Sequence, residues 1–222
     1  MCGRFTLMFD AEELKDEFNL DQVPPDVFPR FNIAPGQPLL VVADWAAKRA
    51  EYMKWGLVPS WAKDPAIGNK MINARSETVQ EKPSFRNAFR RRRCLILADG
   101  FYEWQRSGAK GPSIPYYFYP IDHRPFAFAG LWEFWRSPEG TDLRTCTILT
   151  TQANGVVTPV HDRMPVMLDA AGMESWLSPG TEESWMALLR PYPDELLSAH
   201  TVSRLVNSPD HDSSDLVKPI AA

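Results

Sequence analysis

Cys2, the second residue of the chain, offers the most reactive chemistry in the sequence. Initiator methionine is usually removed ahead of a small residue, and loss of Met1 leaves Cys2 with a free α-amino group beside its thiol. An ordinary α-amine titrates near pH ~8 and an ordinary thiol near pH ~8.5, so at neutral pH both nucleophiles are expected to lie within about a pH unit or two of their deprotonated forms. The pair can attack an ester or amide, or condense with an aldehyde and close a thiazolidine ring. The alternative is an inert cysteine in a disordered terminus.

Glu103 is the second candidate, because it lies among aromatic residues in the run Asp99-Gly-Phe-Tyr-Glu-Trp104. Strand alternation places Phe101 and Glu103 on one face and Tyr102 and Trp104 on the other. A carboxylate in apolar surroundings has a raised pKa and can hold a proton near neutral pH, as a general acid must. The alternative is a glutamate that faces solvent from a strand.

His161, Asp162 and Arg163 bring three ionisable side chains together in a segment that ends at Pro165. Histidine suits proton transfer or contact with a sugar hydroxyl, arginine suits a phosphate, and Asp162 could orient either of them. The same residues could equally form a turn with one structural salt bridge.

Asn73, Arg75 and Glu77 supply an amide, a guanidinium and a carboxylate from one short segment, although Ser76 and Glu77 could simply open a helix. The four histidines show no HxH or HxxxH spacing, and the carboxylates fit no ligand pattern. We therefore expect no metal site and no cofactor.

Six positive charges, Lys82, Arg86 and Arg90 to Arg93, lie between positions 82 and 93 without an acid among them. They could attract a phosphate backbone, or they could be solvated side chains at the end of a helix. Trp61 ends the aromatic and proline-containing segment that begins at Trp55. It could stack on a nucleic-acid base from a loop, although such tryptophans are more often part of the core.

The elements that must position these residues are mostly strands. Asp10 and Glu13 predict an N-terminal cap for a short amphipathic helix with Ala11, Leu14 and Phe18 on one face. Prolines 24, 25 and 29 prevent regular structure before Arg30. Strands are predicted over 39–43, 49–55, 94–98, 101–106, 116–119, 125–130 and 145–151, with turns at 107–108 and 122–123. Helices are predicted from Asp169 to Ser178 and from Thr181 to Arg190. The pattern indicates an α+β fold with a mostly antiparallel, barrel-like sheet and peripheral helices.

The composition is that of a folded protein: of 222 residues, 44% are hydrophobic and 23% are charged. Without a repeat or a low-complexity linker, residues 1–222 are expected to form a single domain. The net charge of −4 argues against a protein that coats nucleic acid with its whole surface, so an anionic partner must be met locally. Three cysteines without close spacing support neither a disulfide framework nor a zinc site.

No signal segment opens the chain, and no apolar run is long enough to cross a bilayer. We therefore expect a cytoplasmic protein without membrane contact, nucleoid-associated in a bacterium or nuclear in a eukaryote. We also expect it to act as a monomer.

Seven segments in order resemble the SRAP family, the SOS-response-associated peptidases that process abasic sites. They are MCGRF (1–5), FNIAPG (31–36), WGLVPSW (55–61), NARSE (73–77), ADGFYEW (98–104), FAGLWE (128–133) and HDRMP (161–165). The match extends from residue 2 to about Pro219. Leu97 stands where proline is frequent in the family and Ser76 where alanine is frequent, and neither touches a candidate catalytic group.

The resemblance implies a protein that shields abasic sites in single-stranded DNA by covalent attachment and removes residues ahead of the cysteine autocatalytically. It implies that Cys2 is the nucleophile, Asn73 holds the N-terminus and the sugar, Glu103 is the acid and base, and His161 contacts the opened sugar. It also implies that Arg4, Arg75 and Arg163 bind phosphates, with Trp61 as a further DNA contact. These roles agree with the chemistry of an aminothiol and an aldehyde.

Two other functions use the same residues. A cysteine hydrolase would attack a peptide or amide with Cys2, with His161 or Glu103 as the base. It would turn over such a substrate instead of retaining a stable bond to an aldehyde. A single-strand-binding module would use arginines and aromatic side chains alone, so its binding would survive Cys2→Ser and disappear in denaturant.

Overall fold

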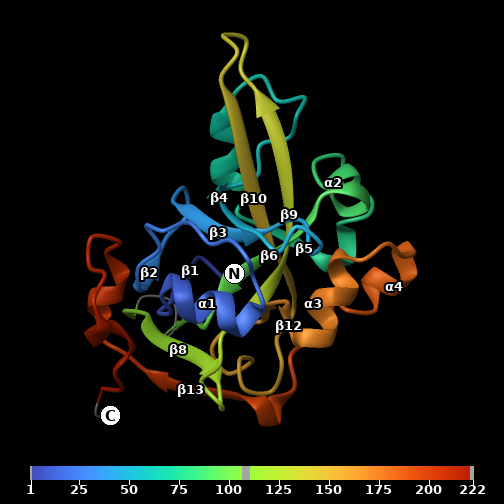
Figure 1. Cartoon of the computed structure of the whole chain (residues 1–222). Coiled ribbons are helices and arrows are strands. Elements are labelled where there is room, and N and C mark those ends of the chain that lie inside the picture. Colours follow the sequence, from blue (N-terminus) through green and yellow to red (C-terminus); the bar gives the residue numbers. More distant parts are fainter. Residues whose placement is uncertain (1, 107–110, 221–222) are drawn as a thin grey trace.

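Five strands close into a β-barrel at the centre of the computed structural model, which describes residues 2–106 and 111–220 (Figure 1). The barrel follows the order β10-β4-β3-β6-β9, and β9 pairs with β10 to complete the ring. Its strands are β3 (Pro38–Val42), β4 (Ala50–Trp55), β6 (Arg93–Ala98), β9 (Phe126–Arg136) and β10 (Asp142–Gln152). All its pairings are antiparallel except β4 with β10. The fold is therefore α+β and mostly antiparallel, as the sequence predicts.

A second, five-stranded antiparallel sheet has the order β13-β8-β7-β1-β2. Its strands are β1 (Arg4–Leu7), β2 (Arg30–Ile33), β7 (Gly100–Gln105), β8 (Ile114–Pro120) and β13 (Leu197–Thr201). In this sheet Arg4 lies opposite Tyr102 and Phe5 opposite Phe101. Continuing that register by one residue brings Gly3 opposite Glu103, so the N-terminal segment runs beside the candidate acid.

Strand β10 also positions the remaining candidate residues, because two short strands pair with its second half. β5 (Asn73–Arg75) runs parallel to it, with Asn73 opposite Ile148 and Arg75 opposite Thr150. β11 (Arg163–Pro165) runs antiparallel to it, with Arg163 opposite Gln152. A last short strand, β12 (Met167–Leu168), pairs with β9. Segments from residues 73 and 163 thus meet at one end of β10.

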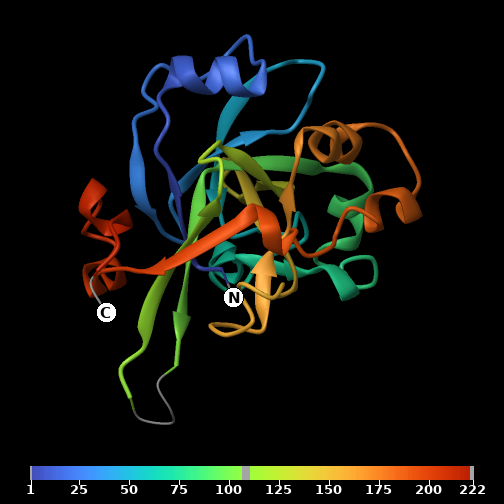
Figure 2. The same cartoon turned by 90° about the horizontal axis from the view of Figure 1, so that it is seen from below.

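The helices lie outside the two sheets (Figure 2). In α1 (Ala11–Phe18), Asp10 and Glu13 form a capping box, and Leu14 and Phe18 are buried, as predicted. The other α-helices are α2 (Arg86–Arg91), α3 (Ala170–Leu177) and α4 (Glu182–Met186). Short 3₁₀ helices cover Pro65–Lys70, Ser76–Thr78, Asp194–Leu196, Arg204–Asn207 and Ser214–Val217. No helix of the described residues is long and apolar enough to cross a membrane.

Aromatic side chains fill the space where the barrel and the second sheet meet. Phe5 makes edge contacts with Trp55 and Phe128, with ring centres 5.3 and 5.5 Å apart. Phe101 stacks on Phe118 at 5.0 Å. Because such rings bury a large apolar area and prefer these offset geometries, they fix the second sheet against the barrel. The sheet that carries the N-terminus is therefore rigidly placed.

Several predicted elements differ from the observed ones. β9 and β10 are longer than predicted, because their outer ends form a hairpin that projects beyond the barrel (Figure 1). α4 ends at Met186 instead of Arg190. Strands β1, β2 and β13 were not predicted, because four or five residues carry too little periodicity to stand out. The predicted turn at residues 107 and 108 lies outside the described residues.

Candidate active site

Asn73 holds the backbone of Cys2. Its Nδ2 donates a hydrogen bond of 2.7 Å to the carbonyl oxygen of Cys2, and the Cys2 side chain is fully buried. The other amide atom of Asn73, Oδ1, is also buried and has no hydrogen-bond partner among the described residues. Because a buried polar atom without a partner is unfavourable, Oδ1 is available to a donor on a ligand. Asn73 therefore places Cys2 and has one acceptor left over.

The thiol of Cys2 differs from the sequence-based expectation. Burial raises its pKa far above the ordinary value, and the nearby carboxyl group of Glu103 raises it further. The prediction that the thiol lies within about a pH unit or two of its deprotonated form at neutral pH is therefore wrong, because it used the pKa of an exposed cysteine. Sulfur chemistry at Cys2 requires a neighbouring base to accept the thiol proton.

Glu103 is buried on β7, with 3% of its surface exposed. Burial raises the pKa of its carboxyl group, while the charge of His161 lowers it. This direction agrees with the expectation from the surrounding aromatic residues. Since Glu103 acts on the pKa of Cys2 and His161 acts on that of Glu103, the three side chains share one electrostatic site.

His161 has two competing contacts at its Nδ1 atom. The backbone N–H of Arg163 donates to this atom at 3.0 Å, and Oδ1 of Asp162 lies 2.9 Å from it. A neutral imidazole with its proton on Nε2 accepts from Arg163, whereas an imidazolium donates to Asp162. The two contacts are therefore alternatives, and in both states Nε2 carries a proton and is the nitrogen that can donate into the site.

Arg163 is held by a carboxylate and a strand. Its Nη1 and Nη2 atoms bind Oε1 and Oε2 of Glu77 at 2.5 and 3.0 Å, and Nη2 also donates to the carbonyl of Thr150 at 2.6 Å. Its hydrogen bonds hold the pKa of Glu77 below the ordinary value. With only 11% of its side chain exposed, Arg163 serves first to fix the segment that carries His161. A phosphate would have to share this guanidinium with Glu77.

We expect Glu77→Gln to lower the free energy of unfolding by up to about 1 kcal/mol at neutral pH, a value reduced for solvent screening because Glu77 is partly exposed. The pKa of Glu77 is lower in the folded chain, so this stabilisation is present above its unfolded pKa and is lost as the pH falls through its folded pKa. Denaturant unfolding at several pH values measures it. Glu139→Ala, an exposed substitution, is the control, and a difference that persisted unchanged in strong acid would contradict this role.

The other predicted DNA contacts differ in how accessible they are. Arg4 is half-buried and donates to Oδ1 of Asn32 at 2.9 Å and to the carbonyl of Val206 at 2.6 Å. Arg75 is exposed at the end of β5. Trp61 is 58% exposed in a loop, whereas Trp55 is buried in the core. Arg75 and Trp61 therefore present surfaces that a ligand can reach directly.

Three of the four basic residues at 90–93 make contacts within the folded chain. Arg90 pairs with Glu182 at 2.6 Å, and Arg92 pairs with the buried Glu133 at 2.7 Å. The Arg93 guanidinium lies 3.5 Å from the ring centre of Trp185 and donates to the carbonyl of Trp176. Three of these four arginines thus join α2 to the rest of the protein. Their contacts within the folded chain argue against a primary role in attracting phosphate.

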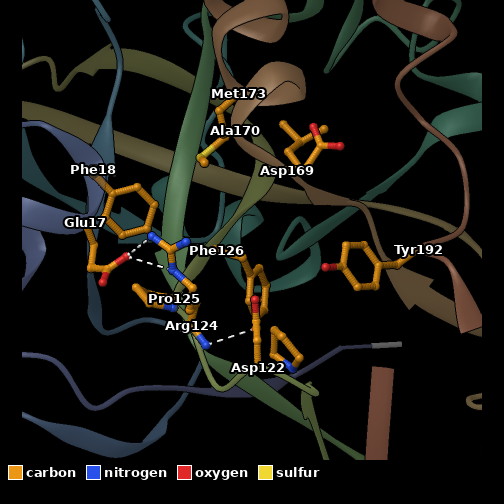
Figure 3. A pocket seen from close by; sticks show the side chains of 12 residues that line it. Glu17, Phe18, Asp122, Arg124, Pro125, Phe126, Asp169, Ala170, Met173 and Tyr192 are labelled. Carbon is orange, nitrogen blue, oxygen red and sulfur yellow. Dashed lines mark hydrogen bonds and ion pairs between the residues drawn. The ribbon is translucent and has the colours of Figure 1, made fainter. Parts of the chain in front are cut away.

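A cavity of about 260 Å³ lies away from these residues, between α1, α3 and the start of β9 (Figure 3). The hydroxyl of Tyr192 points toward its interior, whereas the carboxyl group of Asp169, which also lines the cavity, accepts a hydrogen bond from the backbone N–H of Gly172 at 2.7 Å. Burial raises the pKa of Tyr192, and the charges of Asp122 and Asp169 raise it further. Such a negative lining is unfavourable for a phosphate. None of the candidate site residues lines this cavity.

The fold and the site define a class of protein in which a β-barrel and a second sheet enclose a buried cysteine near the start of the chain, a carboxyl group of raised pKa and a histidine. Among the described residues, no group of histidine, cysteine and acidic side chains could hold a metal ion. The chain belongs to the SOS response associated peptidase (SRAP) family, whose pattern matches residues 1–209. The resemblance noted in the sequence is therefore confirmed.

Named relatives match nearly the whole chain. The abasic site processing protein YoqW of Bacillus subtilis is 45% identical over 223 residues, which cover 98% of this chain and 99% of YoqW. The abasic site processing protein HMCES of Pongo abelii is 30% identical over 270 residues, which cover 99% of this chain and 76% of HMCES.

Crystal structures of two bacterial proteins have a similar fold. One, from Bacteroides thetaiotaomicron, matches with a TM-score of 0.90 at 24% identity and covers 99% of this chain and 100% of that protein. The other, from Bordetella bronchiseptica, matches with a TM-score of 0.79 at 26% identity and covers 91% of this chain and 100% of that protein.

Sequence reasoning missed the connection between Glu77, Thr150 and Arg163. Glu77 was noted only as part of a short polar segment, and Thr150 only as part of a strand. The contacts join residues up to 86 positions apart, and no local spacing reports such a distance. Four threonines occur between positions 145 and 151, and the sequence does not show which of them contacts an arginine.

Proposed function

We propose that this protein recognises an abasic site in single-stranded DNA and captures it covalently through Cys2 in a thiazolidine, which shields the lesion. The observation that carries this proposal is the burial of Cys2 beside Glu103, a carboxyl group of raised pKa, with the Cys2 carbonyl held by Asn73. The names of the relatives, abasic site processing proteins, support the same substrate. Residues 1–222 would act as one domain and as a monomer, in a compartment that contains DNA.

Ring opening is the first step. An abasic deoxyribose is mostly a closed hemiacetal and has no free aldehyde. Protonated Glu103 donates its proton to the ring oxygen, the C1′ hydroxyl gives its own proton to a solvent water molecule, and the C–O bond of the ring breaks to leave an aldehyde and the Glu103 carboxylate. The raised pKa of Glu103 keeps it protonated at a pH where an exposed glutamate is ionised. His161 donates to the hydroxyl that forms when the sugar opens.

Capture of the aldehyde is the second step. The α-amine of Cys2 attacks the aldehyde carbon, and loss of one water gives an imine. The sulfur then bonds to the same carbon, while the thiol proton passes through the Glu103 carboxylate to the nitrogen. The buried thiol requires this base, because its own pKa is raised. Ring closure removes the imine that would otherwise promote β-elimination and strand breakage.

A denaturing gel tests this proposal. The protein is incubated with a single-stranded oligonucleotide that carries one abasic site, and we expect a band of the combined mass that survives heat and denaturant. An identical oligonucleotide without the lesion is the control. A complex that dissociates in denaturant would indicate a non-covalent binding module, and turnover of a peptide or amide without an adduct would indicate a cysteine hydrolase.

We expect the mature chain to begin at Cys2, because an imine requires a free α-amine. Met1 lies outside the described residues, and its removal could be autocatalytic. Intact-mass spectrometry of the protein that forms the adduct measures this directly. If protein that retains Met1 still formed the adduct, the product would have to be a simple thiol adduct and not a thiazolidine.

We expect Arg4→Ala, Arg75→Ala and Arg163→Ala each to weaken binding of single-stranded DNA, and the dependence of affinity on salt to become less steep. Each phosphate contact that is lost reduces the slope of log affinity against log salt by about 0.7 for a single strand. The exposed Arg75 should show this most directly, because Arg4 and Arg163 also hold the fold. Arg136→Ala, outside the site, is the control for charge. Affinity that did not depend on salt would rule out the phosphate contacts.

A further inference from the structure

A second cavity, of about 370 Å³, lies on the face of the five-stranded sheet opposite the candidate active site. Tyr102 and Tyr117 belong to a small hydrophobic cluster on this face, whereas Phe101 belongs to the main core. Because side chains alternate along β7, Glu103 shares the face of Phe101 and not that of Tyr102. The cavity is thus separate from Cys2 and Glu103.

Nearly parallel aromatic rings form one side of this cavity. Tyr117 stacks on Tyr119 with ring centres 5.5 Å apart, and Tyr119 stacks on His123 at 4.9 Å, each pair inclined by 18°. His200 packs against Tyr119 at a steeper angle of 59°, with ring centres 5.3 Å apart. Parallel rings of this kind offer the flat surfaces on which a further planar ring can stack.

The ring of Tyr117 is held in place before any ligand binds. The Tyr117 hydroxyl lies 3.0 Å from the hydroxyl of Thr6, which also donates to the buried carboxyl group of Asp99. That same Tyr117 hydroxyl would lie only 2.2 Å from a Cβ atom at position 100, so glycine is required there. Because the position of Tyr117 is already fixed, a ligand that stacks beside it does not lose binding free energy to ordering of this side chain.

The C-terminal segment forms the opposite wall and supplies a cation. Nε2 of His200 lies 2.9 Å from the carbonyl oxygen of Val217, which fixes the segment against β13. The next residue, Lys218, lines the cavity with 66% of its side chain exposed, and its partner is the exposed Asp215. An exposed pair of this kind is weak, so Lys218 can exchange Asp215 for a phosphate at little cost.

We propose that this cavity binds a nucleobase of single-stranded DNA, which stacks on the rings of Tyr119 and His123 while Lys218 contacts a neighbouring phosphate. The flat rings, the apolar walls and one exposed cation match a nucleotide better than a wholly apolar ligand or a free anion. This inference rests on the proposed function for the kind of ligand, and it adds a second contact on the strand outside the reacting sugar.

Photocrosslinking locates the base. An oligonucleotide of thymine without an abasic site, with 5-iodouracil in place of some bases, is irradiated with the full chain, and the joined peptides are identified by mass spectrometry. We expect Tyr119, His123 or His200 among the joined residues. No crosslink to any of the three would overturn the proposal.

Variants test the affinity. Fluorescence anisotropy with the unmodified oligonucleotide should show binding about fivefold weaker or more for Tyr119→Ala, the loss typical of one stacked base. Lys218→Gln should reduce the slope of log affinity against log salt by the amount expected for the loss of one phosphate contact. His123 is exposed, so His123→Ala should fold and can test the same stacking contact if Tyr119→Ala does not fold. Tyr52→Ala, a partly exposed tyrosine outside the cavity, is the matched control, and equal affinity for all these proteins would contradict the proposal.

Oligonucleotide length separates this inference from the proposed function. On a short abasic oligonucleotide, which reaches only Cys2, we expect Tyr119→Ala to form the adduct at the rate of the unaltered protein. The effect of the substitution should appear only with longer strands. If crosslinks formed at Tyr119 but no adduct formed at Cys2, the proposed function would fail while this site remained.

Discussion

We expect Cys2→Ala to lose the adduct that survives denaturation. The α-amine remains after Met1 is removed, so an imine with the aldehyde can still form, but no sulfur closes the ring. An open imine is reversible and withdraws electrons from the neighbouring carbon, which favours β-elimination. We therefore expect this variant to cut abasic DNA as a lyase while the unaltered protein leaves the strand intact. A denaturing gel that resolves adduct, intact strand and cleaved strand measures all three.

The matched control is Cys146→Ala, because Cys146 is also a fully buried cysteine but lies on β10 outside the site. It should form the adduct normally once its folding has been checked. Borohydride reduction of Cys2→Ala reactions should trap the imine as a stable amine and so prove that the amine still reacts. A fully stable adduct of Cys2→Ala without reduction would refute the role of the sulfur.

We expect Glu103→Gln to slow adduct formation by about 10²- to 10⁴-fold, the range typical of a general acid. Glutamine keeps the size and much of the hydrogen bonding of glutamate but cannot deliver a proton to the closed sugar or accept one from the thiol. The product that finally forms should still be a thiazolidine, and its reversal should also be slow. Time courses on one abasic oligonucleotide give both rates, and an unchanged rate would exclude Glu103 as the acid.

The pH dependence adds a second measure of the same residue. Because the pKa of Glu103 is raised, its acid form persists to higher pH than that of an exposed glutamate, and the rate should fall as the pH rises through that pKa. At lower pH the rate should fall because the amine of Cys2 is protonated. In Glu103→Gln the high-pH decline should disappear. Glu133→Gln, a substitution of another buried glutamate, is the control, since Glu133 pairs with Arg92 and is not one of the candidate site residues.

The sequence determined those features that depend on neighbours along the chain. The capping box of Asp10 and Glu13 correctly marked the start of α1, because its hydrogen bonds join residues three apart. Alternation in the segment around Glu103 correctly indicated a carboxyl group among apolar neighbours, because strand geometry alone decides which side chains share a face. The order of seven motifs identified the family, and the fold class followed from many short strands.

Tertiary structure decided what distant segments do to one another. It buried the thiol of Cys2 and so raised its pKa, and it made Arg92 and Arg93, whose role the sequence left open, into links between α2 and its neighbours. It joined Arg4 to Val206, 202 residues away, and Arg163 to Glu77. Residue types and spacing are local, whereas burial and ion pairing depend on which surfaces meet when the barrel closes. Only the closed fold therefore sets the proton affinities on which the proposed chemistry depends.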